Sequence, residues 1–112
     1  MSVFDFGITQ GDFRTLFESG ARVRLLDVRR KPAYDADTAV IPGAQWRDPE
    51  AVADWSRTLP QDEPVIAYCV HGHEVSQGVA QTLRAAGLDA RFLEGGINSW
   101  RLPAGPTAAK PE

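Results

Sequence analysis

Two short segments of the chain are almost wholly apolar, and each is followed by a stretch with helical character. Residues 23–28 (VRLLDV) and 65–69 (VIAYC) have the composition of strands, and residues 90–93 (ARFL) form a weaker third segment of this kind. Strands that are apolar on both faces are usually covered on both faces. Because these strands alternate with helical segments, the pattern predicts an α/β fold around a parallel sheet with right-handed crossovers.

The helical segments carry recognisable start and stop signals. They cover residues 9–20, 48–60, 76–87 and 97–100. Thr9 is the expected N-cap of the first helix and Ser76 that of the third, while glycine or proline is the last residue of each of the first three segments. The last ten residues hold three prolines and no large apolar side chain. We therefore expect one domain over residues 1–102 and a flexible C-terminal tail over residues 103–112.

Composition and charge exclude several classes of function. The chain has 112 residues, 43% of them hydrophobic, and its net charge of −3 provides no basic surface for nucleic acid. No run approaches the ~18 apolar residues of a membrane span, and the N-terminal residues lack the pattern of a signal peptide. With one cysteine, no internal disulfide can form, which suits a reducing compartment. We expect a cytoplasmic protein that binds neither nucleic acid nor membrane.

The only cysteine, Cys69, stands at the end of the second apolar strand. Ligands of parallel sheets bind at the rim formed by the carboxyl ends of the strands, so Cys69 is expected at that rim. Between Cys69 and Ser76 the chain must turn and enter a helix, and successive N–H groups in such a turn can form an anion-binding nest. A thiolate is an anion that such surroundings favour. The spacing therefore predicts a nucleophilic thiol, supported by the basic residues Arg29, Arg30 and Lys31 after the neighbouring strand.

Three other interpretations stay open at this point. Cys69 can be a small buried residue without chemistry, since free cysteines are often buried. His71 and His73 complete a CysXHisXHis pattern that zinc accepts, but an inward-facing amide loop turns its side chains outward, so we expect no metal and no cofactor. The two histidines either assist a bound group or are exposed polar residues. Glu74 would weaken an anionic site, and it is therefore expected to face solvent.

These residues lie within a longer pattern that resembles single-domain rhodaneses over nearly the whole chain. The matching pieces are LLDVR at 25–29, Tyr34, IPGA at 41–44, YC at 68–69 followed by Gly72, VAQTLRAAG at 79–87 and FLEGGINSW at 92–100. Their order and spacing together make the resemblance specific. Asp27 and Arg29 match the DxR segment of that family, which we interpret as mainly structural.

The resemblance implies a rhodanese-like α/β domain with a central five-stranded parallel sheet and helices on both faces. It also implies that Cys69 is the catalytic residue, accepting a sulfane sulfur as a persulfide from a small-molecule donor such as thiosulfate. The acceptor would be a thiol or cyanide, with a sulfur-accepting protein as a further partner. The residues expected to bind the substrate are those of the loop and two from the neighbouring rim: Val70, His71, Gly72, His73, Glu74, Val75, Ser76, Arg29 and Arg30.

The cysteine loop departs from the pattern of active rhodaneses, and the departures leave two alternatives open. Val70 and Glu74 stand where those enzymes often carry a positive charge. The loop is also one residue longer, similar to the CysX5Arg loop of phosphatase and arsenate reductase relatives, although Val75 replaces the arginine that would clamp an oxyanion. The segment AVI at 39–41 replaces the family's GHI. The alternatives are a phosphatase or arsenate reductase and a catalytically weak binding or regulatory module.

Overall fold

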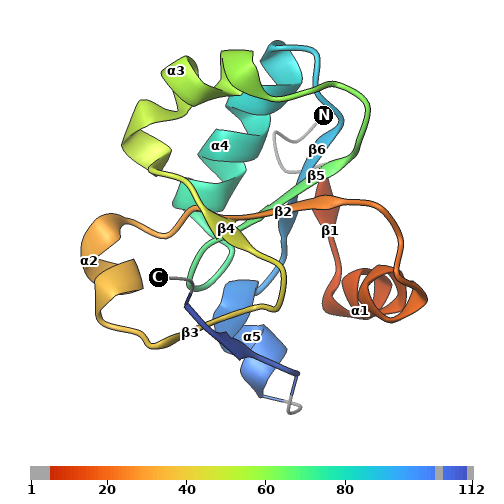
Figure 1. Ribbon diagram of the computed structural model, residues 1–112, viewed down its shortest axis with the longest axis vertical. Coiled ribbons are helices and arrows are strands. Elements are labelled where there is room, and N and C mark those ends of the chain that lie inside the picture. Colours follow the sequence, from red (N-terminus) through yellow and green to blue (C-terminus); the bar gives the residue numbers. More distant parts are fainter. Residues whose placement is uncertain (1–5, 103–104, 111–112) are drawn as a thin grey trace.

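The computed structural model describes residues 6–102 and 105–110, and it is built on a five-stranded parallel sheet. The strands lie side by side in the order β1 (Gly7–Ile8), β6 (Ala90–Leu93), β5 (Val65–Tyr68), β2 (Arg24–Asp27) and β4 (Gln45–Trp46). All neighbouring pairs run parallel. The predicted fold class is therefore confirmed (Figure 1).

The two strands with the clearest sequence pattern, β2 and β5, lie next to each other in the middle of the sheet. Leu25 pairs with Ile66 and Leu26 with Ala67, and every residue of β5 is buried. Burial on both faces explains why these strands read as continuous apolar runs. The outer strands β1 and β4 have two residues each, too short for any sequence pattern.

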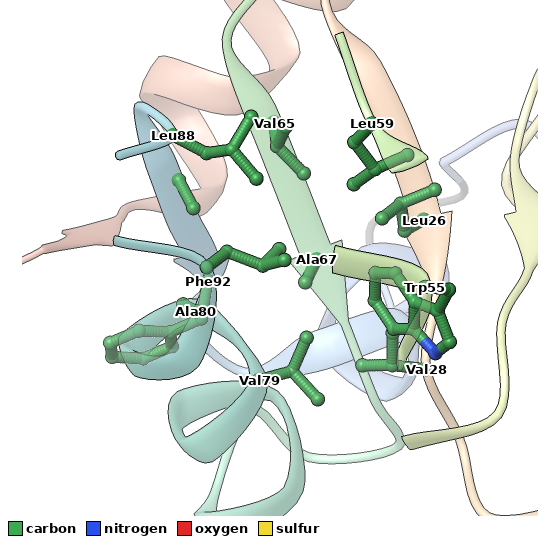
Figure 2. Packing of buried hydrophobic residues seen from close by; sticks show 12 residues of the cluster. Leu26, Val28, Trp55, Leu59, Val65, Ala67, Val79, Ala80, Leu88 and Phe92 are labelled. Carbon is green, nitrogen blue, oxygen red and sulfur yellow. The ribbon is translucent and has the colours of Figure 1, made fainter. Parts of the chain in front are cut away.

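One face of the sheet is covered by α3 (Val52–Trp55) and α4 (Glu74–Ala85), as Figure 1 shows. The side chains between these helices and the sheet form one buried cluster, in which Trp55, Val79 and Ala80 meet Leu26 and Ala67 of the strands (Figure 2). Burial of a side chain of this size stabilises the fold by about 1.5–3 kcal/mol. This layer holds α4, and therefore the loop in front of it, against the sheet.

The opposite face is covered by α1 (Gln10–Ser19) and α5 (Gly96–Arg101). Phe13 and Trp100 are almost fully buried there, with ring centroids 5.1 Å apart in an edge-to-face arrangement. Such aromatic pairs contribute about 0.5–1.5 kcal/mol beyond their buried area. α5 is thereby positioned directly after β6, next to the carboxyl end of β5.

The helix boundaries agree with the sequence signals in part. The Thr9 side chain accepts a hydrogen bond from the Asp12 amide at 3.1 Å, and Gly20 ends α1 with a φ of +71°. The predicted helix over 48–60 is instead three short pieces in succession: a 3₁₀ turn η1 (Pro49–Ala51), α3, and a second 3₁₀ turn η2 (Ser56–Thr58). The prediction of a single helix there is therefore corrected.

The segment predicted as a flexible tail contains a short strand within its described part. β7 (Ala108–Ala109) pairs antiparallel with β3 (Ala39–Val40), and Lys110 Nζ donates to the Tyr34 carbonyl at 3.0 Å. Residues 103–104 and 111–112 of the tail lie outside the described residues. The mobility of the tail stays a prediction.

Within residues 6–102 and 105–110, no helix has both the length and the apolar character needed to cross a membrane.

Candidate active site

Cys69 is the residue that directly follows β5, in the middle of the carboxyl rim of the sheet. Its side chain is free of disulfides and 6% exposed. The thiol donates a hydrogen bond to the hydroxyl of Ser76, with 3.2 Å between Sγ and Oγ. A hydroxyl can also donate, so the same contact can serve a thiolate. The structure therefore places the predicted nucleophile at the predicted rim.

Ser76 is not the cap of the following helix, which corrects the sequence prediction. α4 begins at Glu74, its N-cap position is His73, and no side chain bonds the first amides there. Ser76 lies within the first turn and is fully buried. Its hydroxyl is directed to the Cys69 sulfur rather than to the helix backbone. The local preference of serine for an N-cap is overridden by this longer-range contact.

The backbone amides of the loop are without acceptors. No hydrogen bond among the described residues has an N–H of residues 70–76 as its donor. The first amides of α4 are unpaired for the general reason that a helix start leaves its N–H groups free. Consecutive unpaired amides next to a thiol form the kind of concavity that binds anions. The predicted cradle is thus compatible with the geometry.

The start of α5 holds the loop in place from behind. The amides of Ile97 and Asn98 each donate at 3.0 Å to a carbonyl of the loop, those of Cys69 and Val70 respectively. Gly72 has a φ of +72°, and a Cβ there would come within 2.6 Å of the Leu93 carbonyl oxygen. Only glycine combines this conformation with so close an approach. The loop shape therefore depends on packing against the turn between β6 and α5.

A cavity of about 240 Å³ opens at Cys69 between the loop and the segment after β2. The residues that line it are Arg29, Arg30, Ala33, Cys69, Val70, His71, His73, Glu74 and Val75. Most predicted site residues thus line one cavity, whereas Gly72 and Ser76 are buried and are not part of its lining. Ala33 was not predicted to contribute. It belongs to α2 (Lys31–Asp35), whose proline at the second position was the one sequence signal for a helix beside the rim.

Arg29 forms part of the wall, but its charge is already engaged. Its guanidinium is 2% exposed and donates to Asp27 at 2.6 Å, to Asp37 at 2.9 Å and to the Ala39 carbonyl at 3.0 Å. Burial acts to lower the pKa of this guanidinium, but the hydrogen bond and charge of Asp27, together with the hydrogen bond to Asp37, raise the pKa above its usual value. The predicted attraction of an anion by Arg29 is therefore weakened by its own partners.

The same network reaches β5 through Tyr68. Its hydroxyl donates to Asp27 at 3.1 Å and accepts from the Ile41 amide at 3.1 Å. Burial, followed by the charge of Asp27, raises the pKa of Tyr68 well above its usual value, so the phenol stays protonated. The residue preceding Cys69 is thereby tied to β2 by a buried hydrogen bond. This supports the interpretation of Asp27 and Arg29 as mainly structural.

Asp37 connects the network to α5, because it also receives a hydrogen bond from Arg101. Burial acts to raise the pKa of Asp37, but the hydrogen bonds from Arg101, the Ala39 amide and Arg29 outweigh it and lower the pKa to about 2. The carboxylate is therefore ionised at neutral pH.

The two histidines are exposed, with ring centroids 6.0 Å apart, and both line the cavity. In the part of the chain that the structure describes, no three side chains of the types His, Cys, Asp or Glu form a group that could hold a metal ion. The CysXHisXHis pattern thus lacks the convergence that zinc requires. Glu74 is exposed as expected, but it also lines the cavity instead of facing only solvent.

The chain is similar to known proteins over most of its length. The profile of the family described as "Rhodanese-like domain" matches residues 9–102. The thiosulfate sulfurtransferase GlpE of Pseudomonas fluorescens is 36% identical over 88 residues, which cover 79% of this chain and 77% of the relative.

Among solved structures, a rhodanese homolog from Thermus thermophilus is 31% identical, with a TM-score of 0.64 over 80% of this chain and 94% of that one. A Rhodopseudomonas palustris protein described as a possible tyrosine phosphatase is 28% identical, with a TM-score of 0.79 over 91% and 83%. Because the family match spans residues 9–102 and a relative at 36% identity covers more than two thirds of both chains, the chain belongs to the rhodanese-like domain family.

Proposed function

We propose that the protein is a rhodanese-type sulfurtransferase in which Cys69 carries the transferred sulfur. The observation that supports this most directly is the position of the thiol, at the mouth of a cavity and next to a loop whose amides lack acceptors. The relationship to GlpE, a thiosulfate sulfurtransferase, points to the same chemistry.

The first half of the reaction transfers a sulfane sulfur to the enzyme. The Cys69 thiolate attacks the outer sulfur of a donor, a new Sγ–S bond forms, and the S–S bond of the donor breaks. The electron pair of that bond leaves with the rest of the donor, which is sulfite when the donor is thiosulfate. No net oxidant is needed, because the sulfur moves at an unchanged oxidation level. Covalent catalysis of this kind divides one difficult transfer into two easier steps.

The second half returns the enzyme to its starting state. A thiolate or cyanide acceptor attacks the outer sulfur of the Cys69 persulfide, and the pair of electrons of the Sγ–S bond returns to Sγ. A persulfide anion formed in between carries its charge on the outer sulfur. The unpaired amides of residues 70–76 are the groups available to stabilise it, since preformed donors act strongly on localised charge.

Thiosulfate is the first donor to test, and thiols or cyanide are the acceptors. A protein that takes over the sulfur is a further partner. The lone thiol favours a reducing compartment such as the cytoplasm as the place of action.

The test is the intact mass of the protein after incubation with thiosulfate, 3-mercaptopyruvate or a polysulfide. We expect a gain of one sulfur atom, its loss on addition of cyanide, and no gain in the variant Cys69→Ala. An unchanged mass with every donor would falsify the proposal. In that case two assays distinguish the alternatives. Hydrolysis of an aryl phosphate would indicate a phosphatase, whereas slow alkylation of the thiol by iodoacetamide at neutral pH would indicate a binding module.

A phosphatase finds support in the length of the loop and in the relative described as a possible tyrosine phosphatase. Two observations argue against it. Val75 stands where such a phosphatase has the arginine that binds the oxyanion, and the guanidinium of Arg29 is already ion-paired with Asp27 and Asp37. Bidentate recognition of a phosphate needs an unengaged guanidinium. Sulfur transfer is therefore the better supported function.

A further inference from the structure

Two charges of opposite sign line the cavity at Cys69, and they come from different structural elements. Arg30 precedes α2 at its N-cap position, and Glu74 is the first residue of α4. Both side chains are exposed and both line the cavity. Neither takes part in an ion pair or a side-chain hydrogen bond within residues 6–102 and 105–110. The mouth thus presents one cation and one anion with no partner of their own.

The remaining groups at the mouth do not make it basic. Arg29 is compensated by Asp27 and Asp37, and among the described residues the other titratable groups that line the cavity are the Cys69 thiol and the imidazoles of His71 and His73. The side-chain charges of the lining therefore nearly cancel, so the carboxylate of Glu74 opposes the attraction of a small dianion by Arg30 and the loop amides. Like-charge contact of this kind lowers affinity and steers such ligands away.

The size and lining of the cavity point to a small donor with an apolar middle. Its volume of about 240 Å³ lies below the range of roughly 300–1,000 Å³ that is usual for drug-sized ligands. Ala33, Val70 and Val75 add apolar surface to the lining. A molecule that fits carries a carboxylate, an ammonium group and a sulfane sulfur on a short carbon chain.

We propose that the donor is the persulfide of an α-amino acid, with its carboxylate at Arg30, its ammonium group at Glu74 and its outer sulfur at Cys69. This inference deepens the proposed sulfurtransferase function and rests on it. Glu74, which looks unfavourable for an anionic donor, becomes the residue that selects a zwitterionic one. Specificity of this kind combines an attractive contact for one ligand with a repulsive contact for its competitor.

The transfer is balanced without any further reactant. The Cys69 thiolate attacks the outer sulfur of the hydropersulfide R–S–SH, forming Cys69–S–SH. The donor's S–S bond breaks, and its electron pair leaves with the inner sulfur as the amino acid thiolate. That thiolate takes a proton from water and departs as the free amino acid thiol.

The experiment compares four donors on the full chain by the initial rate at which Cys69 gains one sulfur. They are cysteine persulfide, its analogue without the amine (3-mercaptopropionate persulfide), its analogue without the carboxylate (cysteamine persulfide), and thiosulfate. We expect cysteine persulfide to react about three- to fivefold faster than either analogue, the range that partly exposed charge contacts support, and faster than thiosulfate.

Two variants assign the preferences to the two residues. Glu74→Gln should abolish the preference for the amine while keeping that for the carboxylate, and Arg30→Gln should do the reverse. Ratios between donors within one variant are the readout, so a general change in thiol reactivity cancels. Glu18→Gln and Arg57→Gln are matched controls, because both residues are exposed and neither lines the cavity. Their ratios should equal those of the wild type.

The outcomes test the amino acid persulfide donor and the sulfurtransferase function separately. Sulfur transfer from all donors without a charge preference, or with ratios unaltered by both variants, overturns the amino acid persulfide and leaves the sulfurtransferase standing. A wild-type preference for thiosulfate does the same. Absence of transfer from every donor overturns both.

Discussion

The hydroxyl of Ser76 lies 3.2 Å from the sulfur of Cys69, and both side chains are buried. They are seven positions apart in the sequence, and the loop between them bends so that the first turn of α4 faces the end of β5. A hydroxyl in this position can stabilise a thiolate and hold it in place for attack.

Replacement of this hydroxyl should lower the reactivity of the thiol. In Ser76→Ala we expect the rate of alkylation by iodoacetamide at neutral pH to fall about fivefold, because one hydrogen bond of about 1 kcal/mol to the reactive form is lost. Thr82→Ala is the matched control, since its hydroxyl lies on the same helix but donates to the Gly78 carbonyl. Equal rates in Ser76→Ala and wild type would show that the contact has no influence on the thiol.

The shape of the loop should depend on Gly72. A Cβ at this position meets the Gly95 nitrogen and the Leu93 oxygen at 2.6 Å each, at a φ of +72°. Conformational strain of about 1–2 kcal/mol and steric overlap of about 1–3 kcal/mol together predict that Gly72→Ala lowers the free energy of unfolding by roughly 2–5 kcal/mol.

Gly43→Ala separates strain from overlap, because Gly43 has a φ of +88° but no neighbouring atom within 4 Å of a Cβ. Urea unfolding of both variants is the measurement. Similar losses of unfolding free energy in the two variants would mean that steric overlap with the turn after β6 adds nothing to the destabilisation of Gly72→Ala.

The parts of the architecture that could be predicted are those in which burial produces a recognisable pattern in the local sequence. β2 and β5 are recognisable because both faces are covered, whereas β1 and β4 have two residues each and take their conformation from their neighbours. Thr9 caps α1 as expected because the contact joins residues three apart. Ser76 does not cap α4, since a sulfur seven residues away is its partner.

The residues of the candidate site likewise fall into those that the local sequence predicts and those that only tertiary packing brings together. Cys69 and its loop are contiguous, so their proximity follows from the chain itself. Arg30 and Glu74 are more than forty residues apart in the sequence and line one cavity only because β2 and β5 are adjacent. The engagement of Arg29 by Asp37, and of Asp37 by Arg101, likewise depends on tertiary packing. The net charge of the cavity lining could therefore not be predicted from the loop sequence alone.

Breaking the buried ion pair behind the site should be costly. In Arg29→Met the carboxylate of Asp27 stays fully buried without its cation, and such uncompensated charges cost about 3–5 kcal/mol. Arg14→Met is the matched control, because its pair with Glu18 is at the surface and 3.7 Å long, a contact worth less than about 1 kcal/mol. Chemical denaturation of the two variants measures the difference, and equal losses would contradict a stabilising role of the buried pair.

The stability of the protein should depend on pH through Asp37. Its pKa is lowered from 3.8 to about 2 in the folded state, chiefly because hydrogen bonds from Arg101, the Ala39 amide and Arg29 outweigh the effect of burial. A lowered folded-state pKa means that the unfolded chain binds the proton first, so the stabilisation is complete above about pH 4 and is lost as the pH falls toward 2. At pH 6 we expect Asp37→Asn to be less stable than wild type by roughly 2 kcal/mol.

Urea unfolding of wild type and Asp37→Asn between pH 6 and pH 2 measures this difference directly. The gap should stay constant down to about pH 4 and then narrow, because wild type alone loses the ionised carboxylate at this position. Asp35→Asn is a suitable control, since that carboxylate is 53% exposed and pairs only with Lys31 on the same helix. A gap for Asp37→Asn that is independent of pH would mean that the ionised form is not what holds α5 against the segment after β2.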